Sequence, residues 1–137
     1  MALLEKIKTL VESSCPDYHF IYETDRMMNE RADDSPFPCV FFEEYTDGRI
    51  TNRFGWKEQI TVELSFMRLA EFQCDAVVRE RIRDNMKRNA VIPFLRALEQ
   101  AKIIDRVSEY VLMPEPPRFD ANAVSLLLRF NASYKLC

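Results

Sequence analysis

The segment Lys57-Glu-Gln-Ile-Thr-Val-Glu-Leu-Ser-Phe-Met-Arg-Leu69 alternates polar and apolar side chains along most of its length. Successive side chains of a β-strand point to opposite faces of the sheet, so every second residue shares a face. One face of this segment is apolar and is made by Ile60, Val62, Leu64 and Phe66. The other is polar and is made by Gln59, Thr61, Glu63 and Ser65. We therefore predict a half-buried strand whose polar face meets water or a partner.

The same alternation returns near the end of the chain, between Val124 and Tyr134. Its apolar face is made by Val124, Leu126, Leu128, Phe130, Ala132 and Tyr134. Shorter strands are predicted for 19–28, 36–45 and 107–113. The prolines that begin at Pro114 break the last of these, because proline cannot donate to a strand ladder.

The dipeptide Asp47-Gly48 predicts a tight hairpin turn. A type I′ turn needs positive φ at both central residues, and Asp-Gly adopts it readily. Strand pairing is expected to continue beyond the turn, from Arg49 to Asn52. Only two glycines occur in the chain, and Gly55 is the other. We therefore expect a hairpin over 45–57 that projects from the domain.

Two segments have the 3.6-residue period of an amphipathic helix. The first covers residues 2–14 and ends before Pro16. The second runs from Asp75 to about Gln100 and contains Pro93, which we expect to kink or split it because proline lacks an N–H and clashes one turn back. The element order is then α-β-β-β-α-β-β. This order predicts one α+β domain over residues 1–137, with two layers, a mainly antiparallel sheet and helices packed on one face.

Composition excludes several function classes. Neither GxGxxG nor GxxxxGK[ST] occurs, and a single histidine rules out a multi-histidine metal site. We expect no catalytic, cofactor-binding or metal site, and not an enzyme. A net charge of −3 disfavours nucleic-acid and membrane-surface binding. No apolar run approaches the ~20 residues that span a bilayer, and the N-terminus lacks the pattern of a secretory signal. These features predict a cytoplasmic protein.

The residues that could carry chemistry are isolated from one another. His19 stands between Tyr18 and Phe20, in a predicted strand that brings no cysteine to it. The acidic pairs Asp33-Asp34 and Glu43-Glu44 lack the spacing of a calcium loop or a shared proton, so we interpret them as solvated. The four cysteines, at positions 15, 39, 74 and 137, form no CxxC pair and are expected to be free thiols in a reducing cytosol.

Two groups of residues are candidates for a subunit interface. Phe54 and Trp56 share a face if the chain is extended, and Trp is favoured at interface hot spots. Packing in the core or over a sheet edge is an equally good interpretation of this pair. Arg79, Arg83 and Lys87 follow one side of the second helix. They form either a solvated helix face or a surface that docks on an acidic patch of a neighbouring subunit.

The layout resembles the small tail-terminator, tail-completion and neck proteins of long-tailed bacteriophages. The likeness covers nearly the whole chain: an N-terminal amphipathic helix, a strand, a polar loop (29–35), the proline-framed strand entry Pro36-Phe37-Pro38-Cys39-Val40, a hairpin, the long strand that contains Ile60–Phe66, a helix and two final strands. Its only local motif is the proline-framed entry. The long second helix with Pro93 and the segment Pro114–Pro117 depart from the smaller members.

The resemblance implies an α+β structural protein without catalytic residues that forms a homo-oligomeric ring. Its partners would be itself and other phage tail or neck proteins. It would reside in the cytoplasm during assembly and then in the virion tail or neck. A non-catalytic bacterial ligand-binding or regulatory α+β module is the alternative. That alternative rests on the aromatic content of 12%, which core packing explains equally well.

Overall fold

A computed structural model describes residues 3–23, 37–43, 48–51, 55–69, 76–102, 110–115 and 123–135. Its elements are α1 (Leu3–Ser14), β1 (His19–Glu23), β2 (Cys39–Glu43), β3 (Gly48–Thr51), β4 (Lys57–Leu69), α3 (Ala76–Met86), the π-helical turn η1 (Lys87–Val91), α4 (Ile92–Ala101), β5 (Val111–Glu115) and β6 (Ala123–Lys135). The predicted loop 29–35, the acidic residues 33, 34 and 44, and Phe54 lie outside the described residues.

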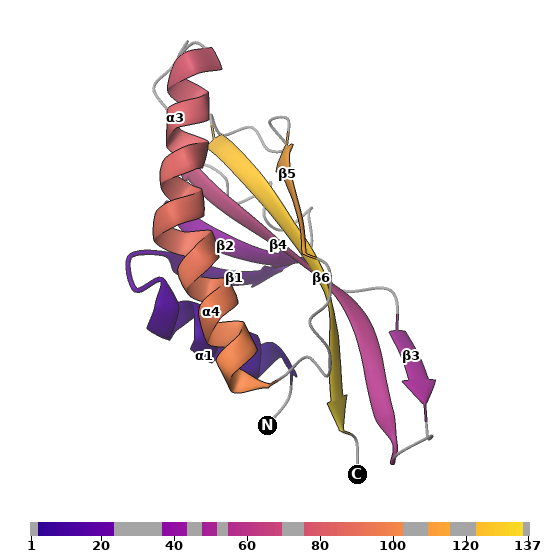
Figure 1. The fold of residues 1–137 in the computed structure, drawn as a ribbon. Coiled ribbons are helices and arrows are strands. Elements are labelled where there is room, and N and C mark those ends of the chain that lie inside the picture. Colours follow the sequence, from indigo (N-terminus) through magenta and orange to yellow (C-terminus); the bar gives the residue numbers. More distant parts are fainter. Residues whose placement is uncertain are drawn as a thin grey trace.

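The predicted two-layer α+β architecture is confirmed. The strands form one sheet in the order β1-β2-β4-β6-β5, and β3 also pairs with β4. Only β1 and β2 are parallel, so the sheet is mixed but mostly antiparallel. The helices pack on one face of it (Figure 1). The observed order has one strand more than predicted, because Gly48–Thr51 forms a strand of its own before β4.

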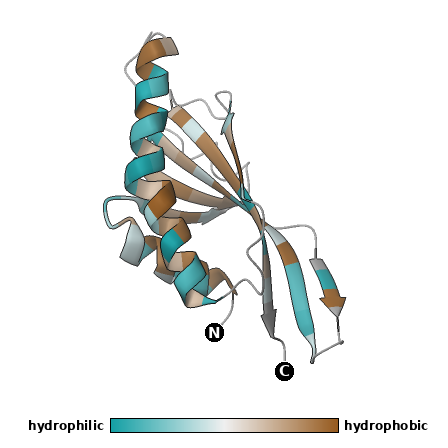
Figure 2. Cartoon of the chain, in the orientation of Figure 1, coloured by the Kyte–Doolittle hydropathy of each residue, from teal (hydrophilic) through white to brown (hydrophobic). Residues whose placement is uncertain are grey.

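The longest contact in the sheet joins β4 to β6. The two strands pair along their whole lengths, from Lys57 opposite Lys135 to Leu69 opposite Ala123. The predicted apolar faces of both strands point toward the helices, and their described side chains are buried there. The strands under the helices are mainly hydrophobic, whereas the first part of β4 is mainly hydrophilic (Figure 2). Alternation in the sequence therefore predicted both the strands and the face that is buried.

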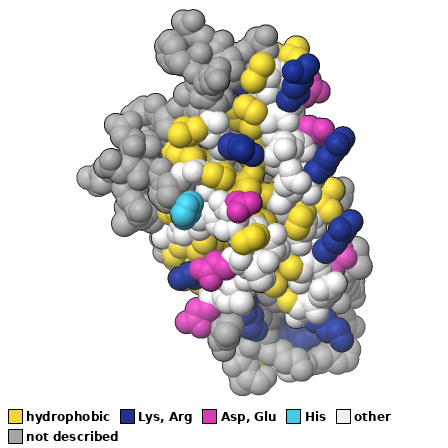
Figure 3. All heavy atoms as spheres, turned by 90° about the vertical axis from the view of Figure 1, so that its left-hand side faces the viewer, with side chains coloured by type: hydrophobic (Ala, Val, Ile, Leu, Met, Phe, Trp, Pro, Cys, Tyr) yellow, Lys and Arg dark blue, Asp and Glu magenta, His cyan; other side chains and the backbone are white. Residues whose placement is uncertain are grey.

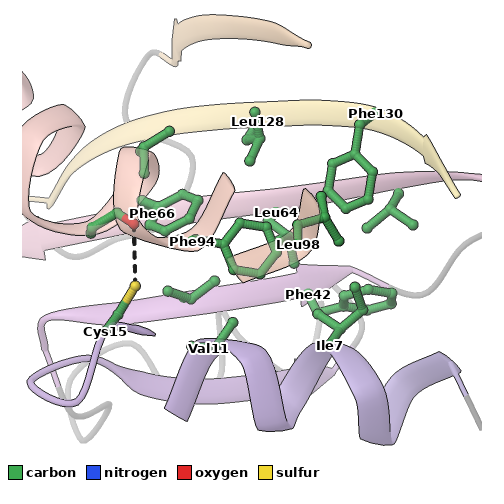
Figure 4. Close-up of a cluster of buried hydrophobic side chains, with 14 of the residues drawn as sticks. Ile7, Val11, Cys15, Phe42, Leu64, Phe66, Phe94, Leu98, Leu128 and Phe130 are labelled. Atoms are coloured by element: carbon green, nitrogen blue, oxygen red, sulfur yellow. Dashed lines mark hydrogen bonds between the residues drawn. The ribbon is translucent and has the colours of Figure 1, made fainter. Parts of the chain in front are cut away.

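Aromatic side chains connect the layers at the centre of the core. Phe94 of α4 lies with its ring centroid 6.2 Å from that of Phe66 on β4 and 6.2 Å from that of Phe130 on β6. The Tyr18 ring lies 6.4 Å from that of Phe66, and the Tyr110 ring lies 6.2 Å from that of Phe130, centroid to centroid. These separations suit tilted and edge-to-face ring packing. The long helix is thus held across two neighbouring strands by one aromatic residue (Figure 4).

Pro93 neither splits nor ends the second helix. The chain remains helical from α3 through η1 to α4, and both Met86 and Ile92 have right-handed helical backbone angles. The Ile92 N–H donates to the Lys87 carbonyl, five residues earlier, so one wide turn precedes the proline. Such a turn is a known way for a helix to accept a residue that interrupts its hydrogen-bond ladder. Of the two outcomes predicted for Pro93, a kink or a split, the split does not occur; the helix is instead distorted locally by the π-helical turn Lys87–Val91.

The predicted hairpin at Asp47-Gly48 is wrong. β2 and β3 are both antiparallel to β4 and pair with different parts of it, at Leu64–Met67 and Lys57–Ile60. They therefore run in the same direction, and the chain does not reverse between them. The reversal comes between β3 and β4, where Gly55 has a φ of 96°. The pairing of β3 with the part of β4 that β2 leaves free outweighed the local turn preference of Asp47-Gly48.

The prediction that Pro114 ends the fifth strand is also wrong. Pro114 lies within β5 and is in register with Leu126 of β6. β5 is the last strand of the sheet. An edge strand tolerates proline where the missing N–H would face away from the ladder. Residues 107–109, which were predicted to begin this strand, lie outside the described residues.

We expect Phe94→Ala to lower the free energy of unfolding by about 3–5 kcal/mol, because it leaves a cavity among fully buried rings. Ile92→Ala is the matched control in the same helix, since Ile92 is 43% exposed. Its cost should stay below about 1 kcal/mol. Denaturant unfolding of both variants measures the difference. Equal costs would contradict the role of Phe94 as the link between the layers.

Gly55→Ala tests the position of the reversal. A Cβ built at Gly55 meets nothing within 4 Å, so its cost comes from the positive φ alone. We expect a loss of about 1–2 kcal/mol in the free energy of unfolding. Gly55→Asn should cost less, because asparagine accepts positive φ more readily. A thermal unfolding midpoint that is unchanged in Gly55→Ala would show that this backbone conformation is not required.

Candidate interaction site

Three strands continue beyond the helical layer and form what we call the extension. It consists of β3, the first four residues of β4 and the last four residues of β6. In Figure 1 it projects from the end of the sheet opposite α3. In the part of the chain that the structure describes, β3 pairs with β4 alone. The extension therefore presents the open edge of a β-strand, which is a template for pairing with another chain.

Two large apolar side chains are exposed on the extension. Ile50 of β3 is 62% exposed, and Trp56, which precedes β4, is 50% exposed. Trp56 is therefore not packed in the core, which was one interpretation of the pair Phe54 and Trp56. Sequence reasoning did not single out Ile50, although it lies in the segment 49–52 that was expected to pair. Exposed aromatic and branched residues beside an open strand edge are typical of a contact surface.

The sheet face opposite the helices is polar at its centre. The Arg129 Nε donates to the Glu63 Oε1 at 3.0 Å across the β4–β6 pair. In the next rung of this face, the Thr61 hydroxyl donates to the Asn131 Oδ1 at 3.0 Å. These cross-strand contacts use the side chains that alternation placed on the polar face, so the prediction of a wet face is confirmed in this region. These two contacts join side chains of β4 to side chains of β6 on this face.

The same face is apolar near β1 and β2. Ile21, Cys39, Phe41 and Met67 form a second buried cluster there. Sequence reasoning missed this cluster, although a signal exists. Cys39-Val-Phe-Phe42 is apolar without alternation, which is typical of a strand buried on both faces.

The basic residues of the long helix do not form a uniform stripe. Arg79 and Lys87 are exposed, whereas Arg83 is half-buried. The Arg83 Nε is buried and has no hydrogen-bond partner among the described residues. Figure 3 shows Lys and Arg side chains at intervals along one border of the molecule, with Asp and Glu between them. An acid of the same helix, Asp84, lies with its Oδ2 3.2 Å from a guanidinium nitrogen of Arg88.

The structure does not bring the two predicted groups together. Trp56 lies on the extension, and Arg79, Arg83 and Lys87 lie on α3 and η1 at the other end of the molecule (Figure 1). They therefore belong to two separate surfaces. That either surface contacts a neighbouring subunit stays a prediction.

The described histidine and acidic residues do not gather into a group that could bind a metal ion. His19 is exposed on β1, and its backbone N–H donates to the Pro38 carbonyl at 3.0 Å. The described part of the chain contains no group of three or more His, Cys, Asp or Glu residues that could hold a metal ion. The strand register does set Glu23 beside Glu43 on β1 and β2.

The two described thiols are buried and play a packing role. The Cys15 Sγ donates to the Ala90 carbonyl at 3.2 Å and so ties the end of α1 to the π-helical turn (Figure 4). Burial raises the pKa of Cys15, against a smaller opposite effect of the Ser14 hydroxyl. Burial raises the pKa of Cys39 to about 12. Both thiols are therefore neutral near pH 7 and are poor nucleophiles.

The aromatic residues that support a ligand-binding module are mostly core residues. Phe41, Phe42 and Phe66 are fully buried. Phe20 is half-buried, with its ring centroid 6.3 Å from that of Phe42. These rings fill the space between helices and sheet or lie in the second cluster, so packing accounts for these four residues.

No family model matches the chain, and no curated protein matches it significantly. Among the described residues, no helix combines the length and the apolar character needed to cross a bilayer.

We expect the buried thiols to resist labelling. In the variant Cys74→Ser/Cys137→Ser, only Cys15 and Cys39 remain. Native protein at about pH 8 should react with a disulfide reagent much more slowly than unfolded protein, because only the thiolate reacts and burial raises the pKa of both thiols. Colorimetric titration with and without denaturant measures both rates. Rapid labelling of the native protein would contradict the burial of these thiols.

Proposed function

We propose that the protein is a structural subunit that works by self-association into a ring, in the manner of the tail-terminator and head–tail neck proteins of long-tailed bacteriophages. The observation that carries the proposal is the extension, with its open β3 edge and its exposed Ile50 and Trp56. The partners would be other copies of the chain and neighbouring tail or neck proteins. The proposal assigns no nucleic-acid or membrane partner, no cofactor and no catalytic residue.

The extension has the properties that a subunit contact requires. An incoming strand can pair with the β3 backbone groups that bond to no described strand, which supplies directional hydrogen bonds. Burial of Ile50 and Trp56 removes two large apolar side chains from water, each of which contributes on the order of 2 kcal/mol when fully buried. The extension also lies at one end of an elongated sheet (Figure 1). A contact between this end and a different surface of the next copy is heterologous, and such contacts form a ring when the rotation from one copy to the next closes.

The rest of the described chain is consistent with a structural role. The two described thiols are buried, and the central polar side chains of β4 and β6 pair across the strands. The protein would reside in the cytoplasm during assembly and then become part of the virion tail or neck.

Trp56 makes the proposal directly measurable, because it is the only tryptophan of the chain. A half-exposed indole emits at longer wavelength than a buried one. We expect wild-type emission to shift toward shorter wavelength as protein concentration rises and Trp56 becomes buried in the contact. Light scattering coupled to size exclusion should show a closed oligomer over the same concentration range, and electron microscopy should show rings.

Ile50→Asp should weaken self-association about tenfold or more, because it places a charge in the contact. Val111→Asp is the matched control, since Val111 is also a β-branched residue exposed on an edge strand. It should leave self-association unchanged. A wild-type protein that stays monomeric at high concentration and does not bind isolated tail tubes would overturn the proposal.

A further inference from the structure

A buried hydroxyl group without a hydrogen-bond partner lies where α1, the sheet and the long helix meet. Tyr18 lies in the turn between α1 and β1 and is 8% exposed. Its backbone N–H donates to the Cys15 carbonyl at 2.9 Å, which holds the turn in place. Its side-chain hydroxyl is buried and bonds to no described residue. Native proteins rarely keep such a group unless a water, an ion or a functional role accounts for it.

Arg68 of β4 brings a positive charge to this hydroxyl. The Tyr18 ring packs edge-to-face on Phe66, with the ring centroids 6.4 Å apart. Phe66 and Arg68 are two residues apart on β4, so both belong to the face that the helices cover. Burial raises the pKa of Tyr18, and the guanidinium of Arg68 opposes part of that rise. The two groups are therefore close together, but they are not aligned for a hydrogen bond with each other.

Arg68 is held in place by a neutral side chain of α3. Its Nη1 donates to the Asn85 Oδ1 at 3.1 Å. In the part of the chain that the structure describes, no acidic side chain forms an ion pair with Arg68. A guanidinium has five N–H donors in a planar fork, so donors remain after the contact with Asn85. Arg68 is exposed, and a ligand can reach it from solvent.

We propose that Arg68 and Tyr18 bind a small oxyanion, such as phosphate or a carboxylate, at the junction of α1, β4 and α3. Arg68 supplies the charge and a pair of parallel N–H donors, which match the oxygens of either group. The Tyr18 hydroxyl supplies a third donor and gains the partner that it lacks in the chain. Asn85 is a positioning residue, because it acts through Arg68. The site lies at the end of β4 away from the extension and does not depend on ring assembly.

The charge and the donors of this junction decide the class of ligand. Both groups are hydrogen-bond donors at neutral pH, because the guanidinium stays charged and burial keeps the phenol protonated. A cation would be repelled by Arg68, and a neutral apolar molecule would leave the hydroxyl without a partner. An oxyanion satisfies both groups at once.

Thermal unfolding with added anion tests the site. Inorganic phosphate or acetate is titrated at constant ionic strength, in exchange for chloride. We expect the unfolding midpoint of the wild type to rise with at least one of them, because a ligand that binds only the folded state stabilises it. At about ten times the dissociation constant, the unfolding equilibrium constant should fall about tenfold. A response to phosphate alone assigns a tetrahedral oxyanion, and a response to acetate assigns carboxylates.

Tyr18→Phe separates a ligand site from a purely structural role. The substitution keeps the ring on Phe66 and removes only the hydroxyl. Without added anion, this variant should be at least as stable as the wild type, because it no longer buries a hydroxyl without a partner. Its affinity for the anion should fall about tenfold. A loss of stability without anion would show that the hydroxyl is already bonded within the chain and would overturn the inference.

Arg68→Gln should abolish the anion response, because it removes the charge. Arg68→Lys should keep part of it, since lysine retains the charge but lacks the planar fork. Arg96→Gln and Tyr110→Phe are the matched controls. Arg96 is exposed on α4, and the Tyr110 hydroxyl donates to the Glu99 Oε1 at 3.5 Å. Both controls should keep the full wild-type response, and circular dichroism checks that each variant is folded.

Two further results would overturn the inference. An equal rise of the midpoint in the wild type, Arg68→Gln and Arg96→Gln would show a general effect of salt on the protein. A wild-type midpoint that responds to neither phosphate nor acetate would show that the junction binds no oxyanion. Either result leaves the proposed ring assembly untouched, because that assembly is measured by oligomeric state.

Discussion

The antiparallel pairing of β4 with β6 is the constraint on which the rest of the molecule depends. Both strands have thirteen residues and pair along their whole lengths. This register assigns each alternate side chain to the helical side or to the open side, because a shift of one residue would exchange the two faces. The length of β4 also leaves room for two short strands on its other edge, which β2 and β3 occupy one after the other.

The helical layer depends on this pair in turn. Phe94 reaches both strands through Phe66 and Phe130, so the long helix is positioned by ring packing across the pair. The wide turn before Pro93 keeps the helix continuous, and the Cys15 thiol fastens α1 to that turn. Proline often ends a helix and cysteine often marks a reactive site, but here Pro93 lies inside a continuous helix and Cys15 is a buried packing residue. Their environment, not their residue type, decides their role.

The same geometry creates the surfaces that we assign to assembly. β4 and β6 are longer than the helical layer that covers them, so their far ends continue with β3 into the extension. The helices lie on one face only, and the other face of β4 and β6 carries the cross-strand polar contacts at its centre. A subunit whose β3 edge pairs with no described strand presents at that end a surface that differs from the rest of the molecule, as a contact between unlike surfaces requires. None of these surfaces requires a reacting group.

The sequence by itself determined the fold class, the two long strands with their buried faces, and both helical segments. These follow from periodicity, because burial on one face imposes a period of two on a strand and about 3.6 on a helix. Only the tertiary structure decided the place of reversal between β3 and β4, the retention of Pro114 in an edge strand, the half-burial of Arg83 and the exposure of Trp56. Each depends on which distant strand or helix lies alongside, and local residue preferences carry no information about that neighbour. The candidate surfaces were therefore only partly predictable: the residue types were visible in the chain, but their separation onto opposite ends was set by packing.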